Sequence, residues 1–470
     1  MIIGTGIACF AAAAAVAQPL QADAGSGISA TVYRSSKDRP FREVRDDVPF
    51  SALWRAAGTP VLDLDAARPS HKFLGLGVSF AESGAKLLAE MPAERRERIM
   101  RMLWTKEGIN LTVGRIHVGC SDYSAHMYTY ADVPGDMELR HFSIDPDRRY
   151  VLPFIKEAAK LQPQLFCFSS VWTPPAWMKL NRELCGGWIS RRHLPVFCDY
   201  YVKFLLAYRD EGIDIRALTV QNEPYSDQDG QSADCKWGPE EEMDVVGRLL
   251  PPRLKAAGLS TQIWLRDSEP DEWQQTLWEL DDPDVRANVA GIAWHSYGSN
   301  PDNMRKVSAK HPGIPMYHTE MGPHLEYEKR SLVWWGSLVA RFLNAGCGTF
   351  VSWCPVLDEE GGPNLSRGFR CAGLVEVHSE TGAVTPSNQY KLFRHIGPYV
   401  ERGADVLSAP EGRSVVAFRN PDGSHVIVAA VESAPRDRKM QLQVKLGGMY
   451  RSFQLPVGTV STIILRRRAD

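Results

Sequence analysis

The sequence lacks the motifs of several large classes of protein. Its nine cysteines form no CxxC pair and no cysteine–histidine cluster at zinc spacing, which argues against a structural zinc site. Gly75 and Gly77 have no third glycine after them and do not open a helix, so they do not form a dinucleotide-binding loop. With 54 basic and 56 acidic residues, the formal net charge of -2 gives nucleic acid no electrostatic attraction. We therefore expect no metal, no cofactor and no nucleic-acid partner.

Long hydrophobic runs are also scarce. The apolar stretch from Ile2 to Ala17 is too short for a membrane span and resembles the apolar region of a secretory signal. Small-residue cleavage sites end at Ala17 and Ala24, but no lysine or arginine precedes the apolar run. A mis-assigned start or a disordered tail is the alternative. We expect a signal peptide over residues 1–24, export to the periplasm or the exterior, and no transmembrane anchor; the oligomeric state cannot be predicted.

The cysteines are scattered, and eight would remain after cleavage of the signal. Cys185 and Cys198 could pair across a loop. Cys167 and Cys347 lie in apolar runs, which is typical of buried thiols. We expect no obligatory disulfide framework.

The middle of the chain alternates short apolar runs with helical patterns, as strand and helix units do. The helical patterns include residues 85–103, 150–161, 194–208, 240–256 and 327–344. Eight apolar runs are strand candidates: residues 74–80, 111–118, 165–171, 216–221, 262–265, 291–295, 315–319 and 348–353. Such units predict a (β/α)8 TIM barrel.

The pattern changes after about Pro386. Short β-like runs over 414–418, 425–431, 441–444 and 459–465 are separated by Gly, Pro and Asp turns, and helical periodicity is largely gone. This favours a β-sandwich attached to the barrel. We assign residues 25–65 to an N-terminal β segment that contributes to the sandwich, 66–385 to the barrel and 386–470 to the C-terminal β-sandwich domain.

Two carboxylate motifs follow strand candidates of the barrel. ALTVQNEP places Glu223 after one apolar run, and IPMYHTEMG places Glu320 after another. The carboxyl ends of the strands are where barrel enzymes carry out their chemistry. Two carboxyl groups facing one cleft suggest glycoside hydrolysis, whereas a structural pairing with arginine is the alternative. Thirteen tryptophans are compatible with sugar-binding platforms, but tryptophan also fills cores.

An ordered set of motifs resembles glycoside hydrolase family 30, which includes glucosylceramidases and β-1,6-glucanases. The motifs lie within residues 73–404 and read RIHVGCSDYS, YTYADVPGD, SSVWTPPAWMK, VQNEP, GIAWHSY, HTE and EGGPN. The resemblance implies retaining hydrolysis, with Glu223 as the general acid/base and Glu320 as the nucleophile. It implies that the two carboxyl groups lie about 5–5.5 Å apart.

The resemblance also implies substrate-binding roles for six residues around the two glutamates: Arg115, Asp122, Trp172, Asn222, Tyr297 and Trp353. Arg115 would bond to Glu320 and keep it ionised, and Tyr297 would point its hydroxyl at the same carboxylate. The two tryptophans would line the sugar-binding subsite. Asp122 and Asn222 would contact sugar hydroxyls.

Other aromatic and imidazole side chains receive structural interpretations. We expect Trp177 to pack structurally. His295 and His318 stand at strand ends without a third ligand at metal spacing, so we interpret both as hydrogen-bonded or packed histidines.

The chain departs from the family pattern at several positions. Ser296 stands where the family often has Trp, Glu82 where Asp is common, and Cys120 and Ser121 reverse the usual order before Asp122. Because serine is small, we expect a wider mouth of the sugar subsite beside Ser296, unless a loop residue refills the space.

The expected function is retaining hydrolysis of β-glucosidic bonds in a carbohydrate or glycolipid substrate such as glucosylceramide or a β-glucan. A β-1,6-glucanase or a β-xylan-cleaving relative is the alternative within the enzyme class. A catalytically inactive carbohydrate-binding barrel is the alternative outside it.

Overall fold

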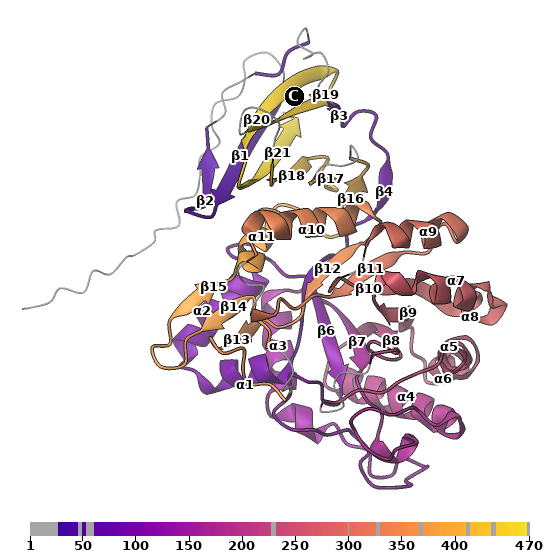
Figure 1. Ribbon diagram of the computed structural model, residues 1–470. Helices are drawn as coiled ribbons and strands as arrows, with labels where there is room; N and C mark the ends of the chain where they lie inside the picture. Colours follow the sequence, from indigo (N-terminus) through magenta and orange to yellow (C-terminus); the bar gives the residue numbers. More distant parts are fainter. Residues whose placement is uncertain are drawn as a thin grey trace, which may run out of the picture.

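A barrel and a β-sandwich stack along the long axis of the molecule (Figure 1). The computed structural model describes residues 27–45, 49–52, 61–226, 232–298, 300–325, 330–365, 370–409, 414–433 and 439–467. The segment expected to be a signal peptide, residues 1–24, lies outside these residues. The predicted fold class, a (β/α)8 barrel with an attached β-sandwich, is confirmed.

The barrel is an eight-stranded parallel sheet. Its strands are β5 (Gly75–Ser79), β6 (Val113–Val118), β7 (Phe166–Val171), β8 (Ile215–Thr219), β9 (Gln262–Ser268), β10 (Val289–His295), β11 (Met316–Glu320) and β12 (Thr349–Ser352). An isolated parallel bridge between Met316 and Cys347 brings β11 to β12 and closes the ring. Each strand overlaps one of the eight predicted runs, because strands buried on both faces read as continuous apolar segments.

Helices surround the barrel and differ from the expected ones mainly in their ends. They are α1 (Glu82–Glu90), α2 (Ala93–Trp104), α3 (Val151–Leu161), α4 (Leu194–Asp210), α5 (Pro239–Met243), α6 (Leu250–Ala256), α7 (Trp273–Asp281), α8 (Pro283–Asn288), α9 (Asp302–Lys310) and α10 (Leu332–Asn344). Single turns lie at Asp145–Arg148, Ala176–Met178, Arg191–His193 and Pro270–Glu272.

Three of the expected helices differ from those in the structure. The pattern over 85–103 is two helices, because Pro92 has no N–H to continue α1. The pattern over 240–256 contains a π-helical segment, Asp244–Leu249, just before Pro251 and Pro252. The helix expected over 327–344 begins at Leu332, where the Ser331 hydroxyl caps it by accepting from the Trp334 N–H at 3.1 Å.

The sandwich has a seven-stranded and a three-stranded sheet. Its strands are β1 (Ile28–Ser36), β2 (Arg39–Val44), β3 (Val61–Asp63), β4 (Pro69–Lys72), β16 (Asp405–Leu407), β17 (Val415–Arg419), β18 (His425–Val431), β19 (Lys439–Leu446), β20 (Met449–Pro456) and β21 (Thr459–Arg467). The early strand β1 pairs antiparallel with β21 at the other end of the chain. Buried residues from both sheets, such as Ile463 and Phe453, share one apolar core.

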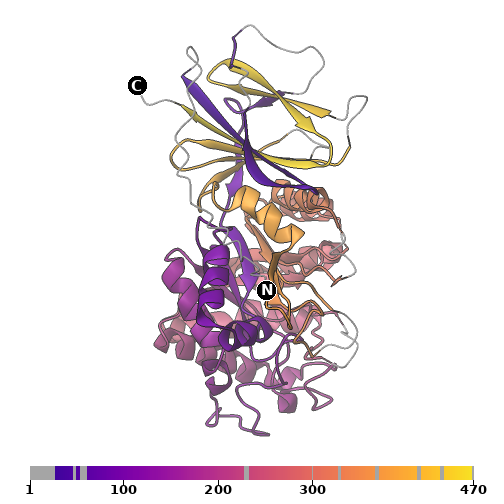
Figure 2. The same ribbon diagram turned by 90° about the vertical axis from the view of Figure 1, so that its left-hand side faces the viewer.

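Two helices lie between the sandwich and the barrel (Figure 2). These are α10 and α11 (Asn388–Ile396), and both contact β21. Helix α11 falls where helical periodicity was expected to be lost, although Leu392, Phe393 and Ile396 form a buried face. Gly336 allows α10 to approach β18, since a Cβ there would lie 2.6 Å from that of Ala430. The domain boundary at residue 386 stays a prediction.

Smaller features complete the fold. Strands β13 (Val356–Leu357), β14 (Val375–Val377) and β15 (Val384–Pro386) form a three-stranded sheet that was not expected. Cys185 and Cys198 are not joined in a disulfide, and Cys167 and Cys347 are buried thiols. None of the helices in the described part of the chain has the length and hydrophobicity that crossing a bilayer requires.

Candidate active site

The inside of the barrel is filled in layers, because side chains two residues apart on a strand point to the same face. An apolar layer contains Val113, Phe168, Ala217, Trp264, Ala293 and Val351. One step closer to the carboxyl ends of the strands lies a buried polar layer of Arg115, Ser170, Thr219, Asp267, His295 and Thr319. The candidate site stands on this polar layer.

Asp267 enters the polar layer through a β-bulge. In the pairing of β9 with β10, Ala293 pairs with Arg266 and Trp294 with Ser268, so Asp267 is an extra residue. Arg266 and Asp267 have φ of 69° and 107°, a backbone conformation that non-glycine residues rarely adopt. The bulge turns Asp267 into the barrel and Arg266 outward, where it pairs with Glu242.

The Asp267 carboxylate is fully buried and accepts five hydrogen bonds. Oδ2 accepts from Arg115, Ser170 and Thr219, each at 2.7 Å. Oδ1 accepts from Thr319 at 2.7 Å and faces His295 Nε2 at 3.1 Å. Burial opposes ionisation, but the positive charges of Arg115 and His295 outweigh it and lower the pKa of Asp267 far below its usual range.

Arg115 on β6 connects Asp267 to the two predicted site segments. Its Nη1 donates to Glu320 Oε2, and its Nη2 donates to Asn222 Oδ1 at 2.7 Å. The guanidinium also lies over the Trp172 ring, 4.5 Å from the ring centroid. The expected contact between Arg115 and Glu320 is therefore present.

Glu320 is the last residue of β11 and is nearly buried, with 5% of its surface exposed. The Tyr297 hydroxyl donates to its Oε1 at 2.5 Å, so Tyr297 does face this carboxylate. Burial raises the pKa of Glu320, and the charge on Glu223 adds to this. The positive charges of His295 and Arg115 act in the opposite direction and partly offset the shift.

Glu223 lies in the turn after β8, with a left-handed φ of 46°. Its N–H donates to the Asp267 carbonyl at 3.0 Å, which ties this turn to the bulge in β9. Its side chain is 15% exposed, and Oε1 lies 3.0 Å from His295 Nδ1. His295 thus stands between Glu223 and Asp267. Although burial disfavours its charged form, Glu320 and these two carboxylates raise the pKa of His295 to about 10.

Glu223, His295 and Glu320 offer atoms within 4.8 Å of one another, a spacing that a metal ion could also use. Both ring nitrogens of His295 already face a carboxylate, Nδ1 that of Glu223 and Nε2 that of Asp267, so the imidazole is engaged on both sides. The trio fits a proton-sharing group better than a metal centre.

The remaining expected residues lie around these carboxylates. Trp172 and Trp353 are buried and stacked, with ring centroids 5.2 Å apart. Asp122 is also buried, and its Oδ1 has no hydrogen-bond partner among the described residues. Burial, together with the charges of Glu320 and Glu223, raises the pKa of Asp122 well above its usual range.

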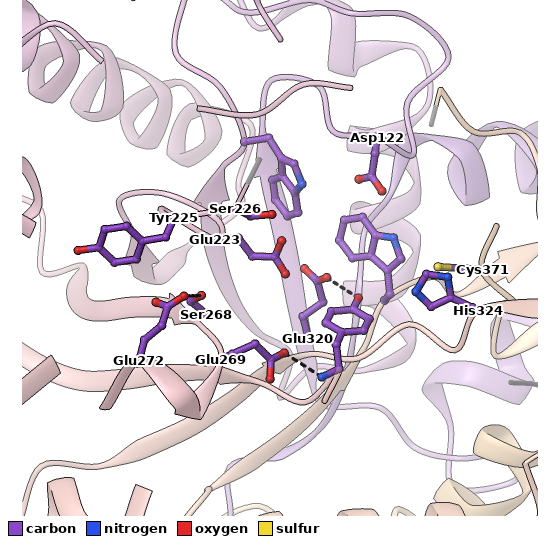
Figure 3. A pocket seen from close by; sticks show the side chains of 13 residues that line it. Asp122, Glu223, Tyr225, Ser226, Ser268, Glu269, Glu272, Glu320, His324 and Cys371 are labelled. Carbon is purple, nitrogen blue, oxygen red and sulfur yellow. Dashed lines mark hydrogen bonds between the residues drawn. The ribbon is translucent and has the colours of Figure 1, made fainter. Parts of the chain in front are cut away.

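These side chains open into a cleft of about 510 Å³ at the carboxyl end of the strands (Figure 3). Its lining residues are Asp122, Trp172, Glu223, Tyr225, Ser226, Ser268, Glu269, Glu272, Tyr297, Glu320, His324, Trp353 and Cys371. Six of the eight predicted site residues line this cleft, and the other two, Arg115 and Asn222, are hydrogen-bonded to each other.

A family model described as the glycosyl hydrolase family 30 TIM-barrel domain matches residues 73–397. The chain belongs to glycoside hydrolase family 30. The chain is therefore a glycoside hydrolase, and the family implies a carbohydrate substrate. The resemblance inferred from the ordered motifs is confirmed.

Relatives of this family 30 hydrolase span most of its length. An endo-1,6-beta-D-glucanase of Neurospora crassa is 28% identical over 434 residues, covering 86% of this chain and 88% of that protein. The lysosomal acid glucosylceramidase of Mus musculus is 26% identical over 405 residues, covering 80% and 78%.

Solved structures agree with the fold. An endo-beta1,6-glucanase of known structure has a TM-score of 0.82 at 25% identity and covers 93% of this chain and 99% of its own. SrfJ from Salmonella typhimurium has a TM-score of 0.84 at 24% identity, with the same coverage, and supports the fold alone.

Sequence reasoning missed several residues of the site of this hydrolase. The predicted strand 262–265 is shorter than β9, which continues to Ser268. The missed residues lie after the end of the predicted strand: Asp267, Ser268, Glu269 and Glu272. The string RDSEPDE after that run is a signal that could have found them, because polar residues at a strand's carboxyl end are typical of barrel sites. No such pattern in the sequence predicts the β-bulge that turns Asp267 inward.

Ser296 does not shape the cleft as expected. Its hydroxyl lies 2.8 Å from His318 Nε2, and His318 Nδ1 accepts from the Val351 N–H at 3.2 Å, so the imidazole donates to serine. Ser296 is 5% exposed and is absent from the cleft lining, whereas its neighbour Tyr297 is part of that lining. Ser296, the residue that departs from the family pattern, therefore has a structural role as the hydrogen-bond partner of His318.

Trp177 and the two histidines have structural environments. Trp177 Nε1 donates to the Ala131 carbonyl at 2.8 Å, in line with the expected packing role. His318 stacks on Phe350 with centroids 3.7 Å apart, and His295 is hydrogen-bonded as described above.

Proposed function

We propose that this family 30 hydrolase cleaves β-glucosidic bonds with retention, with Glu320 as the nucleophile and Glu223 as the general acid/base. The observation that carries the proposal is the separation of the two carboxylates. One oxygen of each lies within 4.8 Å of the other, close to the roughly 5–5.5 Å typical of retaining enzymes. Inverting enzymes need about 6.5–9.5 Å to admit a water between the carboxyl groups.

The surroundings of Glu320 suit a nucleophile. Arg115 and Tyr297 each hold one of its oxygens, which fixes the carboxylate for attack on the anomeric carbon. Attack by Glu320 forms the glycosyl–enzyme ester as the bond to the leaving oxygen breaks. The hydrogen bonds also stabilise the negative charge that returns to Glu320 when water releases the sugar.

The position of Arg115 favours Glu223 as the acid. Arg115 forms ion pairs with Asp267 and Glu320, which stabilises the ionised form of those two carboxylates. Glu223 then protonates the leaving oxygen and later removes a proton from the attacking water. Glu223 lines the cleft and its side chain is 15% exposed, so a substrate in the cleft can approach it.

The glycone would lie on the other side of Glu320. Trp353 and Trp172 provide apolar surface for the sugar ring, and Asp122 Oδ1 is available to a sugar hydroxyl. Asn222 would reach the 2-hydroxyl by its amide nitrogen, since its oxygen is bonded to Arg115.

Two candidate substrates contain a β-glucosidic bond, glucosylceramide and β-1,6-glucan. The relatives include enzymes named for each of them. A β-xylan-cleaving relative is a third possibility. Parallel assays with glucosylceramide, β-1,6-glucan and xylan separate the three. No hydrolysis of any of them, nor of an aryl β-glucoside, would favour an inactive carbohydrate-binding barrel.

Labelling identifies the nucleophile directly. A 2-fluoro β-glucoside with an activated leaving group should esterify Glu320, which peptide mass spectrometry detects. Glu320→Gln should abolish both labelling and turnover. A label on another acidic residue contradicts the assignment.

Leaving-group dependence tests the acid. Glu223→Gln should reduce hydrolysis of alkyl glucosides far more than that of glucosides with activated phenols, which need little protonation. Equal losses on both substrate types would remove Glu223 from the acid role.

We also propose that the protein is exported, on the strength of its N-terminal apolar stretch. Protein recovered outside the cytoplasm should begin near Gln18 or Gly25. Recovery only of intact Met1 protein in the cytoplasm contradicts export.

A further inference from the structure

The cleft has a polar end on the Glu223 side. Tyr225, Ser226, Ser268, Glu269 and Glu272 gather there in Figure 3, whereas Asp122, His324 and Cys371 lie on the opposite side. A general acid stands beside the leaving oxygen, so the group that departs must lie at the end of the cleft that Glu223 faces. That end holds the aglycone if Glu223 has the proposed role.

The two acidic residues at this end, Glu269 and Glu272, differ in how many of their oxygens are hydrogen-bonded. Glu272 is engaged with the protein, because it pairs with the buried Arg266 and accepts from the Ser268 hydroxyl at 2.8 Å. Glu269 uses only one oxygen in this way, since its Oε1 accepts from the Tyr297 N–H at 2.8 Å. Its Oε2 is buried and has no hydrogen-bond partner among the described residues.

A buried carboxylate oxygen without a partner is costly, and a ligand donor that reaches it recovers this cost. A sugar hydroxyl is such a donor, whereas a simple alkyl aglycone has no donor. The Tyr297 N–H holds the first oxygen of Glu269, so the orientation of the second is set by the same residue that positions the nucleophile.

We propose that Glu269 is a specificity-determining residue whose Oε2 accepts a hydrogen bond from a hydroxyl of the aglycone. The preferred aglycone is therefore a sugar, as in a β-linked glucan, and not a hydrocarbon. The inference rests on the proposed function, since it uses Glu223 to locate the leaving group.

Glu269→Gln is a sharp test. The Tyr297 N–H requires an acceptor, so the amide oxygen takes the place of Oε1 and an NH₂ donor replaces Oε2. The two substrates to compare are a β-1,6-linked glucose disaccharide and octyl β-glucoside. Both release an alcohol, so a change in the acidity of Glu223 affects them alike.

The readout is the ratio of kcat/KM for the disaccharide to kcat/KM for octyl β-glucoside. Loss of a hydrogen bond to a charged group should lower this ratio roughly tenfold or more in Glu269→Gln. The matched control Glu97→Gln, on the exposed face of α2, should leave the ratio and both rates as in the wild type. An unchanged ratio in a folded Glu269→Gln variant overturns the proposal.

A substrate series keeps the test independent of any protein variant. Removing the hydroxyls of the leaving glucose one at a time should identify one position whose loss lowers kcat/KM of the wild-type enzyme about tenfold. The same deletion should cost little more in Glu269→Gln. If no position has this effect, the inference fails while the proposed function stands. If the wild-type enzyme cleaves no β-glucoside, the proposed function itself fails.

Discussion

Replacing Asp267 with asparagine removes the charge at the centre of the polar layer while keeping the side chain's shape. The wild-type carboxylate accepts from Arg115, Ser170, Thr219, His295 and Thr319. An asparagine nitrogen accepts none of these bonds, so at least the donors to one oxygen lose their acceptor. Arg115 and His295 then share a single buried anion, Glu320.

The magnitude follows from burial. Asp267 and Arg115 both have no exposed side-chain surface, and removing one member of such a pair costs about 3–5 kcal/mol of unfolding free energy. The pKa of His295 should fall below its present value of about 10, because one of the carboxylates that raises it is lost. Turnover should also fall, because His295 loses the anion that holds its Nε2 and with it part of the positioning of Glu223.

Denaturation in guanidinium chloride followed by tryptophan fluorescence measures this loss. Twelve of the thirteen tryptophans lie between residues 104 and 353, so the signal reports on the barrel. The control is Asp145→Asn, which removes an exposed partner of Arg148 and should leave stability almost unchanged. A loss in Asp267→Asn no larger than that of the control would refute the view that Asp267 anchors this layer.

Three further predictions concern single side chains. Tyr297→Phe removes a donor to Glu320 and should lower kcat on aryl β-glucosides roughly 10- to 100-fold. It also removes the acceptor of the Gly322 N–H, so thermal stability should fall slightly; a loss of kcat smaller than about threefold would contradict the role of Tyr297. Burial, with Arg394 nearby, lowers the pKa of His395 to about 3, so this histidine is neutral in the folded protein. Below about pH 6.5 the same histidine binds a proton in the unfolded chain but not in the folded one. Stability should therefore fall by about 2 kcal/mol between pH 6.5 and 5 from this residue, and His395→Gln should flatten that part of a melting-temperature profile. Ser296→Trp should lower stability and activity on every substrate, because the larger side chain must displace His318; tighter binding of simple aryl β-glucosides in this variant would show that the space opens to the cleft instead.

Much of the fold could be predicted because it depends on local patterns. The eight barrel strands are buried on both faces and read as apolar runs. The turn-separated β runs near the C-terminus correspond to four of the ten sandwich strands, β17, β18, β19 and β21. Helix α11 was missed because it is short and lies beside those strands, where its buried face completes the junction. Its place was decided by packing against α10 and β21, which no local pattern encodes.

The two glutamates were also predictable, since each follows a barrel strand in a recognisable motif. Their separation, the hydrogen bonds from Arg115 and Tyr297, and the raised pKa of His295 depend on five strands meeting inside the barrel. The sequence alone determined which residue types stand at the strand ends. Only the tertiary structure decided that a bulge in β9 turns Asp267 inward. It also decided that Glu269, at the Glu223 end of the cleft (Figure 3), has one oxygen without a hydrogen-bond partner among the described residues. The physical reason is that a one-residue shift in a strand changes the face on which every later side chain lies.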